Sequence, residues 1–341
     1  MSRQTLSQKV RVAFPGLTVK KSYSHKHETS KLPRFISEYL ISKHSDQDGN
    51  LSEEGIQKIV NFISEYYPEH KDKEYLKHQA MQLGSVKVLD EFSVVTDVKH
   101  QTHNVIIPVM GLRDVRIRSS MLLEHENLLR GGMWGIAKII WDPEEEPKIP
   151  NHPRNLMVDE FVPFQVSRCD IQNFIKKREN FTTDEWLDLL ISTMGLNPKM
   201  YNKRTKILLL SRLVPLVESN VNLTELGPKG TGKTFLLRNI SYYSRIISGG
   251  NVSPAVLFYH LVTKTPGLIA LKDIIVFDEI SKIRFSNPDE VMGKLKDYME
   301  SGNYERGPQQ VHADASIVLV GNLPTRYGKP RDKLIFEVLP E

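Results

Sequence analysis

The sequence is nearly free of cysteine, since Cys169 is the one such residue among 341. A single thiol excludes an intramolecular disulfide and is typical of a reducing compartment, so we expect a cytoplasmic protein. The chain also lacks an apolar run long enough to span a bilayer and the pattern of a secretory signal peptide. These absences predict that no membrane is involved. The hydrophobic share of 40% still suffices for a sizeable core in two or three domains.

Acidic residues are scarce at the start of the chain. Residues 1–34 hold eight Lys and Arg side chains and one acid, Glu28, which gives this arm a charge of +7. The other 38 bases and 40 acids sum to −2, so the overall charge of +5 comes from the arm. Such an arm is typical of contacts with nucleic acid, although a merely soluble tail is an equal alternative. The cations that we expect to contact DNA, because they are concentrated and lack nearby acids, are Lys9, Arg11, Lys20 and Lys21.

The spacing of apolar residues changes twice along the chain. Residues 1–83 combine the basic arm with helical periodicity. From Gly84 to residue 168 the period is two, which indicates a small antiparallel barrel or sandwich, and an OB-like barrel is one form of it. Helical patterns return in residues 169–341, where Thr182–Glu185 forms a capping box and Pro215 is expected to kink or end a helix. We therefore predict an α/β chain of three domains with these bounds.

One stretch of the third domain has a spacing with a specific chemical meaning, G-x-x-x-x-G-K-[ST]. Its residues are Gly227, Pro228, Lys229, Gly230, Thr231, Gly232, Lys233 and Thr234. Glycines let backbone N–H groups approach phosphate oxygens, Lys233 carries charge toward the β- and γ-phosphates, and the Thr234 hydroxyl is a ligand for Mg²⁺. A strand precedes the loop, and a helix from Phe235 turns its positive end toward the anion. The sequence thus predicts a site for ATP and Mg²⁺.

Two later strands end in residues that would complete this site. The apolar run 274–277 is followed by Asp278 and Glu279, the Walker B pattern. Asp278 is expected to hold Mg²⁺ through water, and Glu279 to polarise the water that attacks the γ-phosphate. A second apolar strand, 315–321, leads to Asn322, which stands where AAA+ ATPases have sensor 1 and would orient the same water. An asparagine in an ordinary strand-to-loop turn is the alternative.

Residues 299–312, between these two strands, predict a hairpin, because turn residues are flanked by extended ones. In ring ATPases such a hairpin often points into the pore. Arg306 and His312 are therefore candidates to contact a threaded polymer such as duplex DNA. A solvated surface hairpin without that role is an equal alternative.

Several runs of the chain are similar to one known family. They are residues 180–188, 213–234, 248–251 with 257–259, and 297–302 with 315–322. These runs resemble the BrxL family, the Lon-related AAA+ proteins of BREX phage-defence systems. The resemblance covers nearly the whole chain and is most specific in the phosphate loop. It implies an N-terminal DNA-binding region with a helicase-loader-like barrel, a P-loop AAA+ core that forms a ring of six copies or stacked rings, other BREX proteins as partners, and a C-terminal Lon-like domain.

The chain departs from the family pattern at Glu341, soon after sensor 1. The family's AAA+ lid, arginine finger and Lon-like domain are expected to lie beyond this point. No Ser-Lys protease dyad can be assigned, so we do not expect protease activity from this chain. Three functions remain open: a DNA-acting AAA+ ATPase whose hydrolysis drives or gates a DNA-encircling ring, a scaffold that binds ATP and DNA without turnover, and an unfoldase partner of a Lon-like protease.

Overall fold

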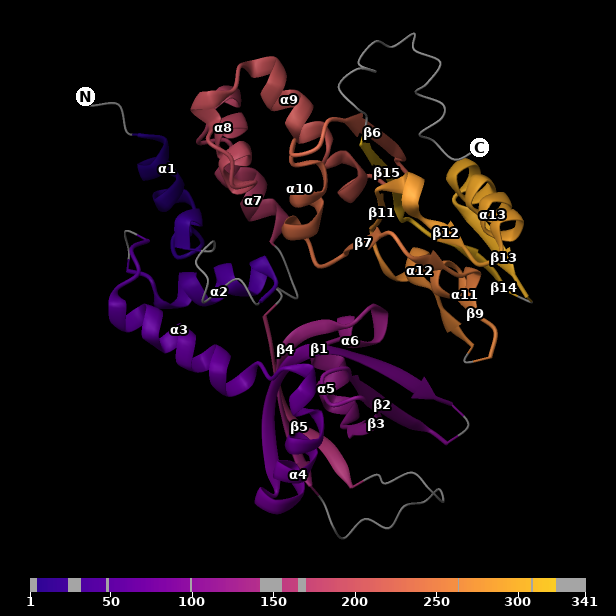
Figure 1. Ribbon diagram of the computed structural model, residues 1–341. Helices are drawn as coiled ribbons and strands as arrows, with labels where there is room; N and C mark the ends of the chain where they lie inside the picture. Colours follow the sequence, from indigo (N-terminus) through magenta and orange to yellow (C-terminus); the bar gives the residue numbers. More distant parts are fainter. Residues whose placement is uncertain are drawn as a thin grey trace. The chain divides into compact units, whose positions relative to one another are not determined.

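The computed structural model describes residues 5–23, 32–46, 49–98, 100–141, 155–164, 170–262, 264–307 and 309–322. The chain forms two compact units, Met1–Asn180 and Phe181–Glu341 (Figure 1). Cys169 and the end of the chain at Glu341 lie outside the described residues. Within the described ranges, no helix is long and apolar enough to cross a membrane. The finer division into three domains stays a prediction.

The first unit begins with helices. They are α1 (Leu6–Ala13), α2 (Arg34–His44), α3 (Glu53–Tyr66) and α4 (Lys73–Leu83), with short 3₁₀ turns at Lys21–Tyr23 and His70–Asp72. The start of α3 is fixed by Ser52, whose hydroxyl accepts a hydrogen bond from the Gly55 N–H at 3.0 Å. Apolar residues of α2 and α3 form one buried cluster, which includes Ile36, Leu40 and Ile59. Burial of this shared face holds the two helices together.

A closed five-stranded barrel follows. Its strands are β1 (Ser85–Asp97), β2 (Thr102–Ile107), β3 (Leu112–Ile117), β4 (Met133–Trp141) and β5 (Leu156–Pro163), in the order β1-β2-β3-β5-β4. Strands β3 and β5 are parallel, and the other pairs are antiparallel. Two short helices, α5 (Ser119–Glu124) and α6 (Asn127–Arg130), connect β3 to β4. A small barrel is thus confirmed, but purely antiparallel pairing is wrong, because β3 and β5 are parallel. The sandwich alternative is also wrong, because strand closure pairs both edges of the sheet.

Alternating burial along the strands builds the barrel core. On β4 every second residue from Met133 to Ile139 is buried, as the period of two predicts. The Phe161 ring lies close against the backbone of Gly135 on this strand, because a Cβ there would lie 2.6 Å from the ring. The core therefore requires both the periodicity and one residue without a side chain. Helix α7 (Ile171–Arg178) completes the first unit.

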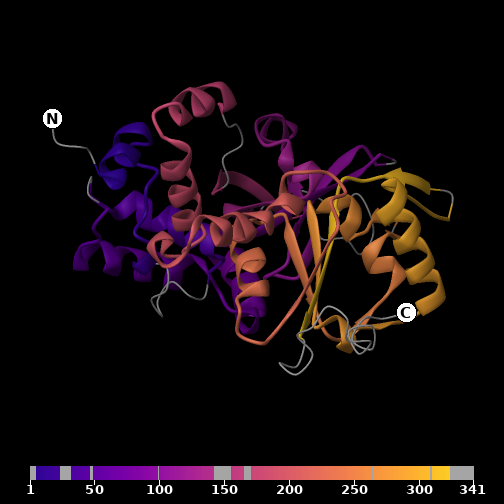
Figure 2. The same cartoon turned by 90° about the horizontal axis from the view of Figure 1, so that it is seen from above.

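The second unit is built on a four-stranded parallel sheet in the order β6-β15-β11-β7. These strands are β6 (Leu223–Gly227), β7 (Ser244–Ser248), β11 (Ile274–Asp278) and β15 (Ser316–Asn322). Helix α10 (Lys233–Ile240) packs Leu237 on one face of the sheet, against Val276 and Val318. Helix α13 (Pro288–Ser301) packs on the other face, against Phe277 and Ile317. Figure 2 shows α10 and α13 on either side of the strands.

Smaller elements surround this sheet. The helices are α8 (Thr183–Thr193), α9 (Lys203–Ser211), α11 (Pro254–Leu257) and α12 (Leu268–Leu271), with 3₁₀ turns at Pro198–Met200, Val214–Leu216 and Ile280–Lys282. The short strands are β8 (Asn251–Val252), β9 (Tyr259–His260), β10 (Thr265–Pro266), β12 (Arg284–Phe285), β13 (Asn303–Arg306) and β14 (Gln309–His312). Strands β13 and β14 pair antiparallel, so the hairpin expected from the sequence is present.

Candidate functional site

The site lies where the parallel strands end. Because all four strands run in the same direction, their carboxyl ends meet at one edge of the sheet. In the register of the sheet, Gly227 is paired with Asn322, and Asp278 is paired with both Val320 and Ser248. The phosphate-loop motif therefore starts beside the strand that ends in Asn322, and Asp278 lies on the next strand across. Topology has brought together residues separated by almost 100 positions of sequence.

A cavity of about 310 Å³ opens at this edge. It is lined by Lys229, Gly230, Thr231, Gly232, Lys233, Thr234, Phe235, Asp278, Glu279 and Asn322. These are ten of the residues expected to bind nucleotide or metal or to take part in hydrolysis. The other two, Gly227 and Pro228, turn backbone carbonyls toward the Lys233 ammonium. The structure thus places all of the expected nucleotide-site residues in or directly beside one cavity.

The loop owes its shape to two glycines. Gly230 and Gly232 have φ values of +80° and +75°, which residues with side chains rarely adopt. A Cβ at either position would meet nothing within 4 Å, so backbone conformation rather than space requires glycine here. Helix α10 begins directly after Gly232, at Lys233, two residues before the start expected from the sequence. Lys233 and Thr234 thus belong to the first helical turn, where N–H groups remain available to an anion.

Lys233 is a buried cation held by neutral groups. Its residue is 5% exposed, and its Nζ donates to the carbonyls of Gly227 and Pro228 at 3.1 and 2.7 Å and to the Thr231 hydroxyl at 3.3 Å. Burying a charge is costly unless a counter-charge compensates it. Carbonyl and hydroxyl dipoles supply part of that compensation, and a phosphate oxygen in the cavity would supply a full negative charge. An anion in the cavity would therefore complete the partners of Lys233.

Asp278 and Thr234 form the candidate Mg²⁺ site. The Thr234 hydroxyl donates to Oδ1 of Asp278 at 2.9 Å, and the Ser248 hydroxyl donates to Oδ2 at 3.2 Å. The described residues contain no group of three or more His, Cys, Asp or Glu side chains that could hold a metal by itself. The Thr234 and Asp278 oxygens fit Mg²⁺, which takes one or two protein oxygens and completes its shell with phosphate and water. The donor set therefore suits a cation that arrives with a nucleotide.

Glu279, the expected base, has an unusual backbone and a charged neighbour. Its φ of +52° and ψ of +53° are left-handed, a conformation that costs a side-chain-bearing residue about 1–3 kcal/mol. Its carboxylate accepts a hydrogen bond from the Lys282 Nζ at 2.9 Å. This bond and the charge of Lys282 lower the pKa of Glu279 below its ordinary value, and Lys229 adds a weaker effect. Sequence reasoning gave no role to Lys282 or Ser248, because Lys282 belongs to no motif and Ser248 only to a run that resembles the family.

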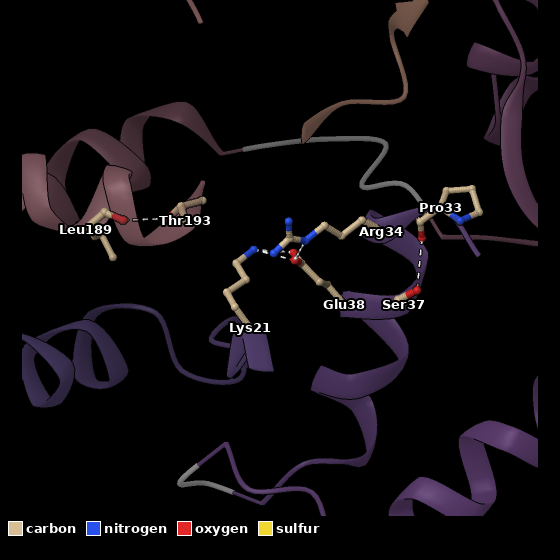
Figure 3. A network of polar contacts seen from close by, with 7 residues as sticks. All are labelled: Lys21, Pro33, Arg34, Ser37, Glu38, Leu189 and Thr193. Carbon is tan, nitrogen blue, oxygen red and sulfur yellow. Dashed lines mark hydrogen bonds and ion pairs between the residues drawn. The ribbon is translucent and has the colours of Figure 1, made fainter. Parts of the chain in front are cut away.

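Lys21 of the basic arm has an acidic partner that the sequence did not predict. Lys21 forms an ion pair with Glu38 at 2.7 Å, and Arg34 also approaches Glu38, at 2.9 Å (Figure 3). The expectation that all four arm cations lack nearby acids is therefore wrong for Lys21, because folding brings α2 beside it. Lys20 donates to the side-chain oxygen of Asn50. Lys9 and Arg11 lie on α1, and their contact with DNA stays a prediction.

The hairpin cations also differ from each other. Arg306 pairs with Glu290 of α13 at 3.2 Å and donates to the Tyr259 carbonyl, and its side chain is 13% exposed. These contacts anchor the hairpin to its own unit, which leaves little of Arg306 for a polymer. The His312 side chain is 69% exposed, and its Nε2 lies 3.9 Å from Asp314. The structure therefore favours His312 over Arg306 as the hairpin group able to reach a partner.

Comparison with known proteins gives the chain's relatives. Residues 12–141 match the family described as the BREX system Lon protease-like protein BrxL N-terminal region. Residues 156–341, more than half of the chain, match the Lon-like protease BrxL-like ATPase domain. An ATPase domain family over the unit that carries the cavity agrees with the geometry of the phosphate loop.

Two curated relatives extend this match over almost the whole chain. The Lon-like protease BrxL of Bacillus cereus is 34% identical over 322 residues, which are 94% of this chain and 47% of the relative. That of Escherichia coli is 32% identical over 312 residues, 91% of this chain and 44% of the relative. The chain spans about half the length of the curated relatives it matches. The chain belongs to the BrxL family of Lon-like proteins.

Proposed function

We propose that the second unit is a P-loop core of the AAA+ class that binds ATP with Mg²⁺ and hydrolyses it. One observation carries this proposal: a single cavity gathers the phosphate loop, Asp278, Glu279 and Asn322 at the ends of parallel strands. The match to an ATPase domain family over the same residues supports it. The direct test is release of inorganic phosphate by the purified chain with ATP and Mg²⁺, against the same reaction in EDTA.

The residues take distinct roles in this proposal. The Lys233 ammonium leaves its carbonyl partners to pair with phosphate oxygens, while backbone N–H groups of the loop and of the first turn of α10 bind the others. Thr234 and Asp278 would hold Mg²⁺, which when bound neutralises charge on the phosphate oxygens. Glu279 accepts the proton of the attacking water after separating from Lys282, and Asn322 orients that water through its amide.

We further propose that this ATPase acts on duplex DNA in a BREX-type defence system in the cytoplasm, as a ring of copies of the chain. The basic arm and the small barrel, which we assign to the OB-like class, support a DNA-facing role, and the family match supports the BREX context. One observation favours the second candidate, a nucleotide- and DNA-binding scaffold without turnover: Glu279 is paired with Lys282. The phosphate-release assay separates these two functions.

The arm gives a prediction about DNA binding. The triple variant with Lys9, Arg11 and Lys20 changed to alanine should bind labelled duplex DNA more weakly than wild type. Each lost phosphate contact should also flatten the slope of log affinity against log salt by about one unit. Fluorescence anisotropy at several salt concentrations measures both quantities.

A matched triple variant controls for total charge. Lys58, Lys71 and Lys77 lie outside residues 1–34, so a slope that depends on the basic arm should change less when they are removed. Equal effects of the two triple variants would show a response to net charge alone. No effect of either would remove the arm from DNA binding.

The ion pair at Glu279 gives a prediction about pH. Lys282→Ala removes the contact that lowers the pKa of Glu279, so that pKa should rise toward its ordinary value. The base must be ionised to act, and the acid limb of kcat/KM for ATP hydrolysis should therefore move to higher pH. Lys282→Arg keeps a cation there and should leave the limb in place. The shift should shrink in high salt, because the pair is exposed to solvent. An acid limb that stays in place in the alanine variant would show that Glu279 does not set it.

A further inference from the structure

Ser248 is the last residue of β7 and lies directly across the sheet from Asp278. Main-chain pairing of β7 with β11 places these two residues in register, after the pairs Ile246–Val276 and Ile247–Phe277. The Ser248 hydroxyl then reaches Oδ2 of Asp278 at 3.2 Å. Ser248 is not among the residues that line the cavity, although its hydroxyl contacts the Asp278 carboxylate. Its position is set by the strand ladder and needs no flexible loop.

The Asp278 carboxylate is consequently held at both oxygens. Thr234, from the first turn of α10, donates to Oδ1 at 2.9 Å, while Ser248 donates to Oδ2. The torsion that turns a carboxylate about its own axis is broad and two-fold, so a single donor restrains it poorly. Two donors from different elements define one orientation of the group. The Thr234 oxygen and the Oδ1 of Asp278 are thereby kept side by side at the cavity.

The residues after Ser248 leave this arrangement undisturbed. Gly249 and Gly250 both have left-handed backbone conformations, with φ of +64° and +80°, and a Cβ on either would meet nothing within 4 Å. The chain therefore turns at the end of β7 through two residues that carry no side chain. Ser248 remains the strand-end group that contacts Oδ2.

We propose that Ser248 is a positioning residue for Mg²⁺, which acts through Asp278 and does not bind the cation itself. This inference rests on the proposed nucleotide site and assigns a role to a residue outside the phosphate-loop and Walker B motifs. Mg²⁺ demands nearly ideal octahedral geometry, so the direction of each ligand or water acceptor matters. Outer partners of metal ligands typically change metal affinity by about 10- to 100-fold when removed. Because Ser248 is exposed and its bond is 3.2 Å long, we expect the lower end of that range.

The test separates the metal from the nucleotide. Affinity for a fluorescent, non-hydrolysable ATP analogue is measured for the full chain in excess Mg²⁺ and in EDTA. The dissociation constant in EDTA divided by the constant in Mg²⁺ reports the contribution of the metal. Ser248→Ala should reduce this ratio by about tenfold and leave the EDTA constant unchanged. Ser248→Thr keeps a hydroxyl on a β-branched side chain that suits a strand, so it should restore most of the ratio.

Ser244→Ala is the matched control, since Ser244 begins the same strand at the end remote from the site. Its buried hydroxyl has no hydrogen-bond partner among the residues that the structure describes. This variant should leave the ratio at the wild-type value. A wild-type ratio in Ser248→Ala would overturn the role of Ser248 while the nucleotide site stands. Absence of nucleotide binding by the wild-type chain would overturn the proposed function itself. If Ser248→Ala unfolds, the threonine variant still decides, because a ratio as low as that of a metal-free site would contradict the hydroxyl's role.

Discussion

Changing Lys233 to alanine is expected to weaken ATP binding by about 100-fold or more. The buried ammonium donates to the Gly227 and Pro228 carbonyls, and in the proposed function it becomes the charged partner of the phosphates. A hydrogen bond to a charged group contributes about 1.5–3 kcal/mol, and the upper end corresponds to a loss of about 100-fold in affinity. Titration with a fluorescent ATP analogue in Mg²⁺ measures the loss.

Lys229 provides the matched control within the same loop. Its side chain belongs to an exposed residue of the loop, so its charge is screened by water and Lys229→Ala should cost far less affinity. Thermal unfolding of both variants checks that the fold survives. Wild-type affinity in Lys233→Ala would remove the phosphate-loop assignment. Equal losses in both variants would indicate attraction by net charge instead of a defined contact.

Changing Glu279 to glutamine is expected to abolish hydrolysis while nucleotide binding is kept. A neutral amide has nearly the same shape but cannot accept a proton from water, and general-base catalysis contributes about 10²- to 10⁴-fold. The phosphate-release rate should fall by that factor, whereas the dissociation constant of the ATP analogue should change little. Glu300→Gln, at an exposed position of α13, is the control for loss of one negative charge.

Two results would contradict this role of Glu279. Unchanged turnover in Glu279→Gln would place the base on another residue. No turnover by the wild-type chain, with binding intact, would favour the scaffold that binds without hydrolysis. Comparison of Lys282→Ala with wild type then shows whether the ion pair keeps the base from acting.

Short-range patterns in the sequence were sufficient for several local features. The capping box at Thr182 forms, with the Glu185 N–H donating at 3.2 Å and the Glu185 carboxylate accepting at 2.9 Å. The helix before β6 ends at Ser211, ahead of Pro215, which lies in a 3₁₀ turn. Such features depend on residues within one or two helical turns, and a linear pattern contains all of them.

Contacts between distant residues were not accessible in the same way. Lys21 and Glu38 are 17 positions apart, and Ser248 and Asp278 are 30 apart. Each pair meets because of helix packing or strand order, which a periodicity does not specify. The choice of a barrel over a sandwich likewise depends on which strands pair, namely β1 with β4 and β3 with β5. The motifs therefore predicted which residues line the site, whereas the partners that contact those residues depend on the topology of the fold.

The left-handed conformation of Glu279 is a further feature that no pattern predicted. Non-glycine residues with positive φ are uncommon, and the described ones in this chain are Gln101, Asn220, Lys264 and Glu279. At Glu279 this conformation places the carboxylate within reach of Lys282 directly after the buried strand β11. Strain of this kind is often found at functional sites.

Calorimetric titration of the purified wild-type chain with a non-hydrolysable ATP analogue, in Mg²⁺ and again in EDTA, tests the central claim most directly. The structure predicts saturable binding of one analogue per chain, tighter in Mg²⁺ than in EDTA, because Thr234 and Asp278 meet beside the phosphate loop. Absence of binding heat in both conditions would contradict the assignment of this cavity as a nucleotide site.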